Sequence, residues 1–394
     1  MSPSDLHVVI RGWGSVSALG TGADAWLNQP GFRSDAATGL PVGALPPAAE
    51  AALETLRRQR PAYRSLDRSV LLALLAAQAA AQRAGWSARD EQPLAVSVGS
   101  SRGATERLEA YHADFLHSGT AAPASSPLTT LGNVASWVAD ALGSSGAAIS
   151  HSSTCSTALQ ALGNAVAWLR AGLIPRFVAG GTEAPLTAFT LAQMRALGIY
   201  SALPADQHPC RPGAGGASTF VLGEGAAVLA LEAVAAAQLR PGDLLLESVG
   251  FGFEATGTKT GLSPEGRHFQ LAMRQALTLA GRGPAEVDLL VLHSPGTAAG
   301  DAAERAAVAQ VFNPALPACT SNKWLLGHTL GASGALSLDL ALRLLRGQQA
   351  PAPLPFASWL NQRPAPAHLR RVLVNAAGFG GNAASALVSV VAAG

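Results

Sequence analysis

The sequence predicts an α/β fold built from two similar halves. Strand-like apolar runs alternate with helical segments along the chain, and the second half weakly repeats the first. Apolar residues make up 48% of the 394 residues, which is enough for one large domain or two fused ones. We therefore expect an N-terminal half over 1–240 and a C-terminal half over 241–394, with a seam at about 235–243.

Both halves open with the same pair of elements. Residues 7–18 and 244–255 are apolar strand runs that break into Gly-rich turns. Amphipathic helices follow at 66–85 and 266–283, and each stops at a glycine, the usual C-terminal residue of a helix.

Two further pairs continue the repeat. Residues 93–101 and 287–296 are short apolar runs that end in small residues, as expected of parallel strands whose carboxyl ends open onto a crevice. Residues 149–172 and 320–347 each begin with a polar strand end and continue into an Ala/Leu-rich helix.

The last pair places Cys155 and His328 at related positions, so we expect the functional site between the halves. Insertions at about 102–148 and 185–218 occur only in the first half and are rich in loops. Such segments usually shape a pocket or a dimer contact.

Composition excludes several classes of function. A net charge of +2, from 27 basic and 25 acidic residues, gives no overall field for nucleic acid. Three cysteines without metal-ligand spacing argue against a disulfide framework and a metal site. The N-terminus lacks a basic flank, and no charge-free apolar stretch reaches about 18 residues, so we expect a cytoplasmic protein without membrane spans.

The stretch HSSTCSTALQ marks Cys155 as a candidate nucleophile. Five Ser and Thr residues surround this thiol immediately ahead of a predicted helix, whereas a structural cysteine usually has large apolar neighbours. A helix N-terminus lowers a thiol pKa, so we expect a reactive thiolate. The alternative is a small buried residue in a tight turn. Cys210 and Cys319 lack this setting and are expected in the core.

His293 and His328 are candidate partners for the thiol. Each lies in a Gly-rich loop just beyond a predicted strand, and the repeat brings both toward the crevice that holds Cys155. Their alternative role is that of hydrogen-bonded loop residues. Lys323 stands out because the chain has 25 arginines and only two lysines, which suggests a need for a compact ammonium group.

Four motifs in this order resemble the β-ketoacyl-acyl-carrier-protein synthases of the KAS I/II type, in the thiolase superfamily, over nearly the whole chain. They are STCSTALQAL, HSPGT…GD…E, KWLLGHTLGASGA and GFGG. Their residues of interest are Cys155, His293, Thr297, Asp301, Glu304, Lys323, His328, Gly378, Phe379 and Gly380. Departures from the family, such as HSPGT for HGTGT and ASTFVLGEGA for RDGF.LGEGA, concern loop geometry and acyl specificity.

The resemblance implies a thiolase-like fold, a five-layer αβαβα sandwich, and a decarboxylative Claisen condensation. Cys155 would carry the acyl chain, while His293 and His328 would stabilise the enolate formed from a malonyl carrier. Lys323 would pair with Glu304 and orient the second histidine. No cofactor is implied, because the substrates arrive on the phosphopantetheine of an acyl carrier protein.

The remaining motif residues would support this chemistry. Backbone N–H groups of Cys155 and Phe379 would form the oxyanion hole, and Phe379 would gate malonyl access. Gly378 and Gly380 would let that loop swing, although GFGG also fits an ordinary tight turn. Thr297 and Asp301 would shape their loop by hydrogen bonds.

Two kinds of partner are expected. Acyl carrier proteins are acidic, and the densest basic stretch, LRRQRPAYRSLDR, offers Arg64 and Arg68 for docking. A solvated helix face is an equally good reading of that stretch. The second partner is another ketosynthase-like subunit, in a homodimer or a heterodimer.

Several alternatives stay open at this stage. A chain-length-factor-like subunit would usually lack the nucleophile, and an acyl-moving relative would lack one of the two histidines. KAS III relatives carry Asn in place of His328, and thiolases use a second cysteine. A papain-type cysteine hydrolase would have neither the repeat nor a second histidine loop. A noncatalytic binding scaffold is the other alternative from a different class of protein. Stretches such as SPLTTLGNVASWVADALG resemble synthases of aryl-polyene or flexirubin-type pigment clusters more than housekeeping fatty-acid enzymes.

Overall fold

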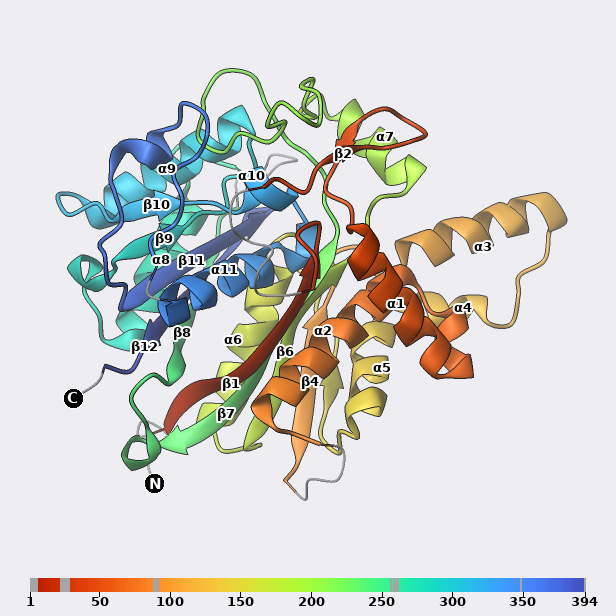
Figure 1. Ribbon diagram of the computed structural model, residues 1–394, viewed down its shortest axis with the longest axis horizontal. Helices are drawn as coiled ribbons and strands as arrows, with labels where there is room; N and C mark the ends of the chain where they lie inside the picture. Colours follow the sequence, from red (N-terminus) through yellow and green to blue (C-terminus); the bar gives the residue numbers. More distant parts are fainter. Residues whose placement is uncertain are drawn as a thin grey trace.

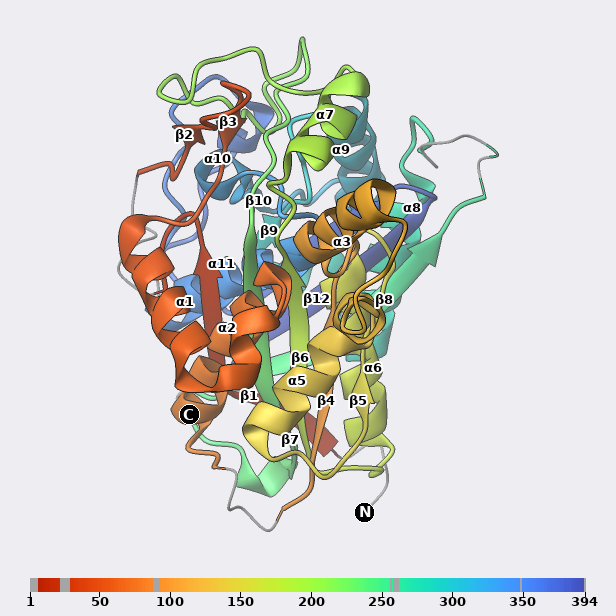
Figure 2. The ribbon, with the colours of Figure 1, turned by 90° about the vertical axis from the view of Figure 1, so that its right-hand side faces the viewer.

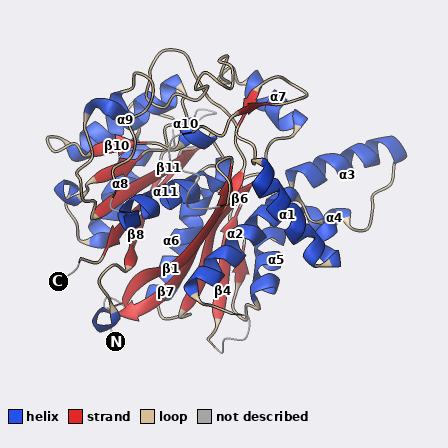
Figure 3. Cartoon of the chain, viewed as in Figure 1, coloured by secondary structure: helices blue, strands red, loops and turns tan. Residues whose placement is uncertain are grey.

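A ten-stranded mixed sheet runs through the molecule, in the order β10-β9-β11-β12-β8-β1-β7-β6-β4-β5 (Figures 1 and 3). The computed structural model describes residues 6–21, 29–87, 92–255, 257, 262–347 and 349–392. Strands β1 and β8 meet only at the pairing of Val9 with Leu245. This narrow junction divides the strands into two sheets of five.

The two five-stranded sheets have the same topology. The first contains β1 (Leu6–Ser17), β4 (Leu94–Gly99), β5 (Ala148–Ile149), β6 (Arg176–Glu183) and β7 (Gly225–Ala235). The second contains β8 (Leu244–Phe253), β9 (Leu289–Val291), β10 (Ala318–Thr320), β11 (Arg371–Gly378) and β12 (Asn382–Val390). In each, the third strand along the chain lies at the edge, followed by the second, fourth, fifth and first. The second strand pairs in parallel with the third and fourth, and the fifth pairs antiparallel with its neighbours.

Helices complete five layers around the sheets (Figures 1 and 2). On the outside, α2 (Arg68–Ala84) and α5 (Asn133–Leu142) cover the first sheet, while α8 (Arg267–Ala280) and α9 (Ala298–Phe312) cover the second. Between the sheets, α6 (Thr157–Arg170) and α11 (Ser333–Gly347) contact strands of both. The predicted duplicated fold and its five-layer αβαβα arrangement are confirmed.

The central helices are apolar on most of their surface because both sides face a sheet. Leu159, Leu162 and Leu169 of α6 and Leu338 and Leu342 of α11 are fully buried in one core cluster. An outer helix such as α2 has a solvated side instead. It begins after Asp67, whose carboxylate accepts the Ser69 N–H at 2.8 Å, and it ends at Gly85 with φ 71°.

Shorter elements connect the main strands and helices. They are β2 (Arg33–Ser34), β3 (Pro41–Val42), α1 (Pro47–Gln59), η3 (Pro61–Ser65), α3 (Thr105–Ser118), α4 (Ser125–Thr129), α7 (Ala188–Ala196), η4 (Ala236–Gln238), η5 (Pro284–Glu286), α10 (Lys323–Leu326), η6 (Leu330–Ala332) and η7 (Trp359–Gln362). The two predicted insertions supply α3, α4, α5 and α7, and α3 projects from the body of the protein (Figure 1).

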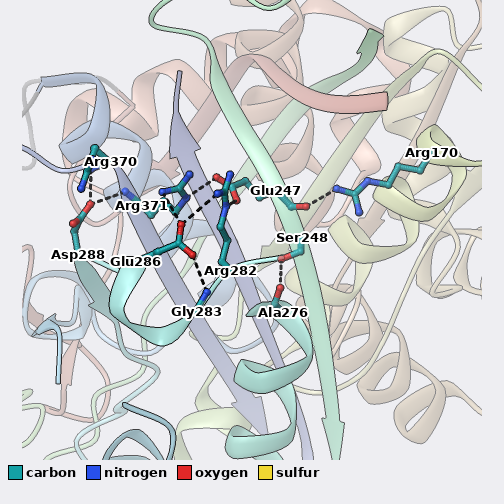
Figure 4. A network of polar contacts seen from close by, with 10 residues as sticks. All are labelled: Arg170, Glu247, Ser248, Ala276, Arg282, Gly283, Glu286, Asp288, Arg370 and Arg371. Carbon is teal, nitrogen blue, oxygen red and sulfur yellow. Dashed lines mark hydrogen bonds and ion pairs between the residues drawn. The ribbon is translucent and has the colours of Figure 1, made fainter. Parts of the chain in front are cut away.

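An ionic network ties elements of the second sheet together near the amino ends of β9 and β11 (Figure 4). The carboxylate of Glu247 on β8 accepts from Arg282 at 3.2 Å and from Arg371 at 3.0 Å. The Asp288 carboxylate accepts the backbone N–H groups of Arg370 and Arg371. Within the described ranges, no helix is both long enough and apolar enough to cross a bilayer.

Candidate active site

Cys155 lies in a tight turn between β5 and α6, where local hydrogen bonds fix the backbone. Thr154 has a φ of 53°, which an L residue rarely adopts. The Thr157 hydroxyl donates to the Thr154 carbonyl at 2.5 Å and accepts the Ser153 N–H at 2.9 Å. These small polar residues therefore shape the turn that presents the thiol.

The thiol is buried, with 8% of Cys155 exposed. Burial and the nearby charge of Glu183 raise the pKa of Cys155 to about 12, against the opposing effect of Lys323. The predicted lowering of the thiol pKa is therefore wrong, because desolvation outweighs the field of the helix N-terminus. Cys155 is a neutral thiol at rest and needs a base to become a nucleophile.

Two buried imidazoles meet at the carboxyl ends of the second sheet. His293 follows β9 and His328 follows α10, and their ring centroids lie 5.0 Å apart at an interplanar angle of 82°. The Nδ1 atoms of both rings are buried without a hydrogen-bond partner among the described residues. Burial lowers the pKa of each histidine well below its ordinary value, and the Lys323 charge adds to this. Both rings are therefore neutral near pH 7.

The thiol and the imidazoles are linked through one apolar cluster. Cys155 packs in an apolar cluster with Phe220 and Leu330. The Phe220 ring contacts the His328 ring edge-on, with centroids 5.4 Å apart. Backbone bonds fix His328 beside this segment, since its N–H donates to the Val221 carbonyl at 2.7 Å. The nucleophile of one half and the imidazoles of the other are thus brought together.

Glu304 holds the His293 loop but does not bind Lys323. Its carboxylate accepts four hydrogen bonds, from the N–H of His293, the N–H and hydroxyl of Ser294, and the amide of Asn375. The predicted ion pair between Lys323 and Glu304 is therefore corrected.

Lys323 is a buried cation with two neutral partners. Its Nζ donates to Asn322 Oδ1 at 3.2 Å and to Ser337 Oγ at 3.3 Å. Burial lowers the pKa of Lys323 to about 8, while the Glu304 charge opposes the shift. Its positive charge adds to the effect of burial, which is the main reason that both imidazoles stay neutral.

The GFGG loop lies directly against the nucleophile turn. A Cβ at Gly378 would lie 2.7 Å from the backbone nitrogen of Cys155, so only glycine fits. The Thr154 hydroxyl is 3.3 Å from the Phe379 carbonyl, and the Phe379 side chain is 49% exposed. Gly380 has a φ of 91°. The loop stands where the gate and oxyanion hole are predicted, and those roles stay predictions.

Thr297 and Asp301 organise the start of α9. The Thr297 carbonyl accepts the Asp301 N–H, and the Asp301 carboxylate accepts the N–H groups of Gly213 at 2.7 Å and Gly296 at 3.1 Å. Burial raises the pKa of Asp301 to about 7. These bonds connect the 213 loop to the loop that carries His293.

Comparison with known proteins identifies the family. The chain matches the profiles "Beta-ketoacyl synthase, N-terminal domain" over residues 31–237 and "Beta-ketoacyl synthase, C-terminal domain" over residues 245–357. The first match alone covers more than half of the chain. The chain belongs to the beta-ketoacyl synthase family. These enzymes are of the acyltransferase type.

Individual relatives agree with this assignment. A 3-oxoacyl-(acyl-carrier-protein) synthase 2 of Staphylococcus aureus (strain N315) is 30% identical over 298 residues, which cover 73% of this chain and 72% of the relative. A putative polyketide beta-ketoacyl synthase 1 of Streptomyces cyaneus is 30% identical over 348 residues, which cover 82% of each chain.

Solved structures share the fold over almost the full chain. A beta-ketoacyl synthase from Burkholderia phymatum STM815 has a TM-score of 0.82 at 25% identity, covering 98% of this chain and 99% of that chain. The ketosynthase ApeO in complex with its chain length factor ApeC, from Xenorhabdus doucetiae, has a TM-score of 0.80 at 25% identity, covering 99% and 100%. The ishigamide ketosynthase/chain length factor has a TM-score of 0.85 at 22% identity, covering 98% and 99%.

One of the two predicted docking residues is engaged inside this synthase. Arg68 donates to Glu224 at 2.6 and 2.9 Å and to Glu50 at 2.5 and 3.0 Å, and its side chain is 21% exposed. The docking role of Arg68 is corrected to a structural one. Arg64 in η3 is exposed and stays a candidate for the carrier.

Two features of the site were missed at the level of sequence. Glu183, fully buried at the end of β6, lies close enough to Cys155 to influence its pKa. A carboxylate that ends the apolar strand RFVAGGTE is the signal that could have found it. Leu191 and Met194 of α7, in the second insertion, pack in the same cluster as the thiol.

Proposed function

We propose that this protein condenses a Cys155-bound acyl chain with a malonyl group, both delivered by an acyl carrier protein. The observation that carries the proposal is the pair of neutral, buried imidazoles, with ring centroids 5.0 Å apart, connected through Phe220 to the apolar cluster that holds the buried thiol. Neutral imidazoles can donate a hydrogen bond to a developing negative charge or accept a proton from a thiol.

In the first half-reaction, Cys155 Sγ attacks the carbonyl carbon of the acyl thioester. A neutral imidazole accepts the thiol proton, since the thiol has a pKa of about 12 and does not ionise unaided. The carrier thiolate leaves and takes a proton. The product is an acyl-enzyme thioester.

In the second half-reaction, the bond between the malonyl carboxylate and its α-carbon breaks and releases CO₂. The electron pair forms a thioester enolate, whose oxygen accepts hydrogen bonds from His293 and His328. Such bonds are strong in a buried, water-poor site. The enolate carbon attacks the acyl-Cys155 carbonyl, the thiolate leaves, and a 3-ketoacyl carrier is formed.

The apolar cluster around Cys155 suits the acyl chain. Its fully buried members include Leu191, Phe220 and Leu222, with Met194 at 9% exposure. Methionine adapts to irregular shapes, which fits a pocket that opens around a ligand. The substrate class that this lining favours is a hydrocarbon chain.

The test is a paired assay of acyl transfer and condensation. Acyl-carrier and malonyl-carrier are supplied, and the acyl adduct on Cys155, the released CO₂ and the ketoacyl product are measured by mass spectrometry and trapping. Cys155→Ala should abolish the adduct, whereas His328→Ala should keep the adduct and lower condensation by about 10²- to 10⁴-fold. Cys319→Ala is the matched control and should change neither.

Two outcomes would overturn the proposal. If Cys155→Ala formed as much ketoacyl product as the wild type, Cys155 could not be the nucleophile. An acyl adduct without any CO₂ or ketoacyl product in the wild-type protein would favour an enzyme that only moves acyl groups.

A heterodimeric role in an aryl-polyene-type pathway is the second candidate. The ketosynthase ApeO, at 25% identity, was solved in complex with a chain length factor. The buried thiol and both imidazoles support the catalytic subunit of such a pair over the chain-length-factor subunit. Purification with each ketosynthase-like neighbour of its gene, followed by native mass spectrometry, distinguishes a heterodimer from a homodimer.

A further inference from the structure

Glu183 is a buried carboxylate that the condensation mechanism above leaves without a role. It ends β6 at 0% exposure and receives five hydrogen bonds. The donors are the Ser100 hydroxyl at 2.6 Å, the Ser101 N–H and hydroxyl at 2.8 and 2.5 Å, the Arg102 N–H at 3.1 Å and the Gly331 N–H at 2.9 Å. A buried carboxylate with this many donors has a specific structural task.

The donors come from two loops that flank the nucleophile. Ser100–Arg102 follow β4, and the Ser100 N–H donates to the His151 carbonyl at the start of the Cys155 turn. Gly331 lies three residues after His328, in η6. Glu183 is therefore the one side chain, among the described residues, to which both loops bind.

Close packing makes the connection sensitive to atomic position. A Cβ at Gly331 would lie 2.6 Å from the Glu183 carboxylate and 2.6 Å from the Ser101 nitrogen. The preceding residue, Leu330, has a φ of 42°, a strained conformation that persists only where its surroundings enforce it. Leu330 in turn packs in the cluster that contains Cys155.

We propose that Glu183 is a positioning residue for condensation, which clamps the turn after His328 to the loop after β4 and so fixes Leu330 and the Cys155 turn. This inference rests on the proposed condensation only where kcat is measured, because the labelling of Cys155 does not need that activity. Without the clamp, the turn at Leu330 relaxes, and the distance between the imidazole and the thiol is no longer fixed. A displacement on the order of 1 Å costs about 10²-fold in rate.

The charge of Glu183 affects the pKa of the Cys155 thiol, which a purely structural role of Glu183 would leave unchanged. Glu183 and Lys323 are the charged groups that act on the thiol, with opposite effects on its pKa. Removing the negative charge should therefore favour the thiolate. A fall of one unit in the thiol pKa would raise its alkylation rate at pH 8 about tenfold.

The experiment compares Glu183→Gln with Glu183→Asp in the full-length protein. The rate of iodoacetamide labelling is followed at Cys155 by peptide mapping from pH 7 to 10, and kcat for condensation is measured in parallel. E183Q keeps the length and loses the charge, so its labelling profile should shift to lower pH. E183D keeps the charge but has a shorter side chain that cannot bind both loops. The pH dependence of its labelling should therefore not change, while kcat falls about 10²-fold.

Asp339→Asn is the matched control. Asp339 is also fully buried and accepts from Trp13 and Ser15 at 2.7 Å each, but it lies on α11 among residues unconnected with the thiol. This variant should lose thermal stability and leave both the labelling profile and kcat unchanged. If E183Q does not fold, Ser101→Ala removes one donor from the clamp and should still lower kcat.

Three results would overturn the proposal. They are an unshifted labelling profile in folded E183Q, an unchanged kcat in E183D or Ser101→Ala, and a profile in D339N that shifts as much as in E183Q. A wild-type protein without condensation activity would defeat the proposed function, yet its labelling profiles would still decide the influence of Glu183 on Cys155.

Discussion

Gly378→Ala should push the GFGG loop off the nucleophile turn. The new methyl group would overlap the Thr154 hydroxyl, which must rotate away, and would lie 2.7 Å from the Cys155 nitrogen and 2.8 Å from Thr154 Cβ. An ordinary contact begins at 3.4 Å, so the two segments must separate by about 0.7 Å. Overpacking of this kind costs about 1–3 kcal/mol.

The magnitude predicts a small thermal effect and a large kinetic one. The entropy of unfolding is about 2.1 cal/mol/K per residue, or about 0.8 kcal/mol/K for 394 residues, so the melting temperature should fall by about 1–4 °C. A displacement of this size in the active site should lower kcat about 10- to 100-fold. Calorimetry and the condensation assay measure the two effects.

Gly85→Ala is the control for stability alone. Gly85 has a φ of 71° at the end of α2, and a Cβ there would meet nothing within 4 Å. The strained backbone should cost about 1 kcal/mol and leave kcat unchanged. A wild-type kcat in the Gly378→Ala variant would refute the reasoning, because the loop would then not bear on the nucleophile.

The remaining predictions concern stability and charge. Arg68→Ala should destabilise the protein by about 3 kcal/mol, because it leaves the buried carboxylate of Glu224 unpaired, whereas the exposed Arg64→Ala should change stability by less than about 0.5 kcal/mol in the same melt. The folded-state pKa values of His293 and His328 lie below the ordinary 6.5, so unfolding binds protons as the pH falls below about 6.5. The contribution of these histidines to stability should therefore be full above that pH and decline progressively below it. In urea titrations at pH 7.5 and 5, His328→Asn should reduce the decline. Equal declines in wild type and variant would contradict the prediction.

The fold could be predicted because its repeat is carried by local patterns. Apolar runs that end in small residues, and Ala/Leu-rich helices that stop at glycine, recur at similar positions in both halves. These features depend on neighbours in sequence and survive without knowledge of tertiary contacts. Even so, the run at 287–296 forms a strand only at Leu289–Val291, because the chain must leave the sheet to present His293.

The site was only partly predictable because its electrostatics depend on distant contacts. The sequence shows Cys155 ahead of a helix, but the burial that raises its pKa comes from segments more than 30 residues away, such as those of Leu191 and Phe220. In the sequence, Arg68 lies four residues after Arg64 at the start of a predicted helix, which indicates an exposed side chain. Its ion-pair partner Glu224 lies 156 residues further along the chain, so the sequence does not reveal the pair. The donors of Glu183 are 81 to 148 residues away in the chain.

The shared strand order of the two sheets also bears on how one chain builds an asymmetric site. Cys155 precedes α6 and His328 precedes α11, so the thiol and one imidazole occupy related places in the two halves. A symmetric pair of identical units would offer two equal groups across the seam. Two unlike halves in one chain instead place a thiol on one side and an imidazole on the other, which is the unlike pair that the proposed chemistry needs.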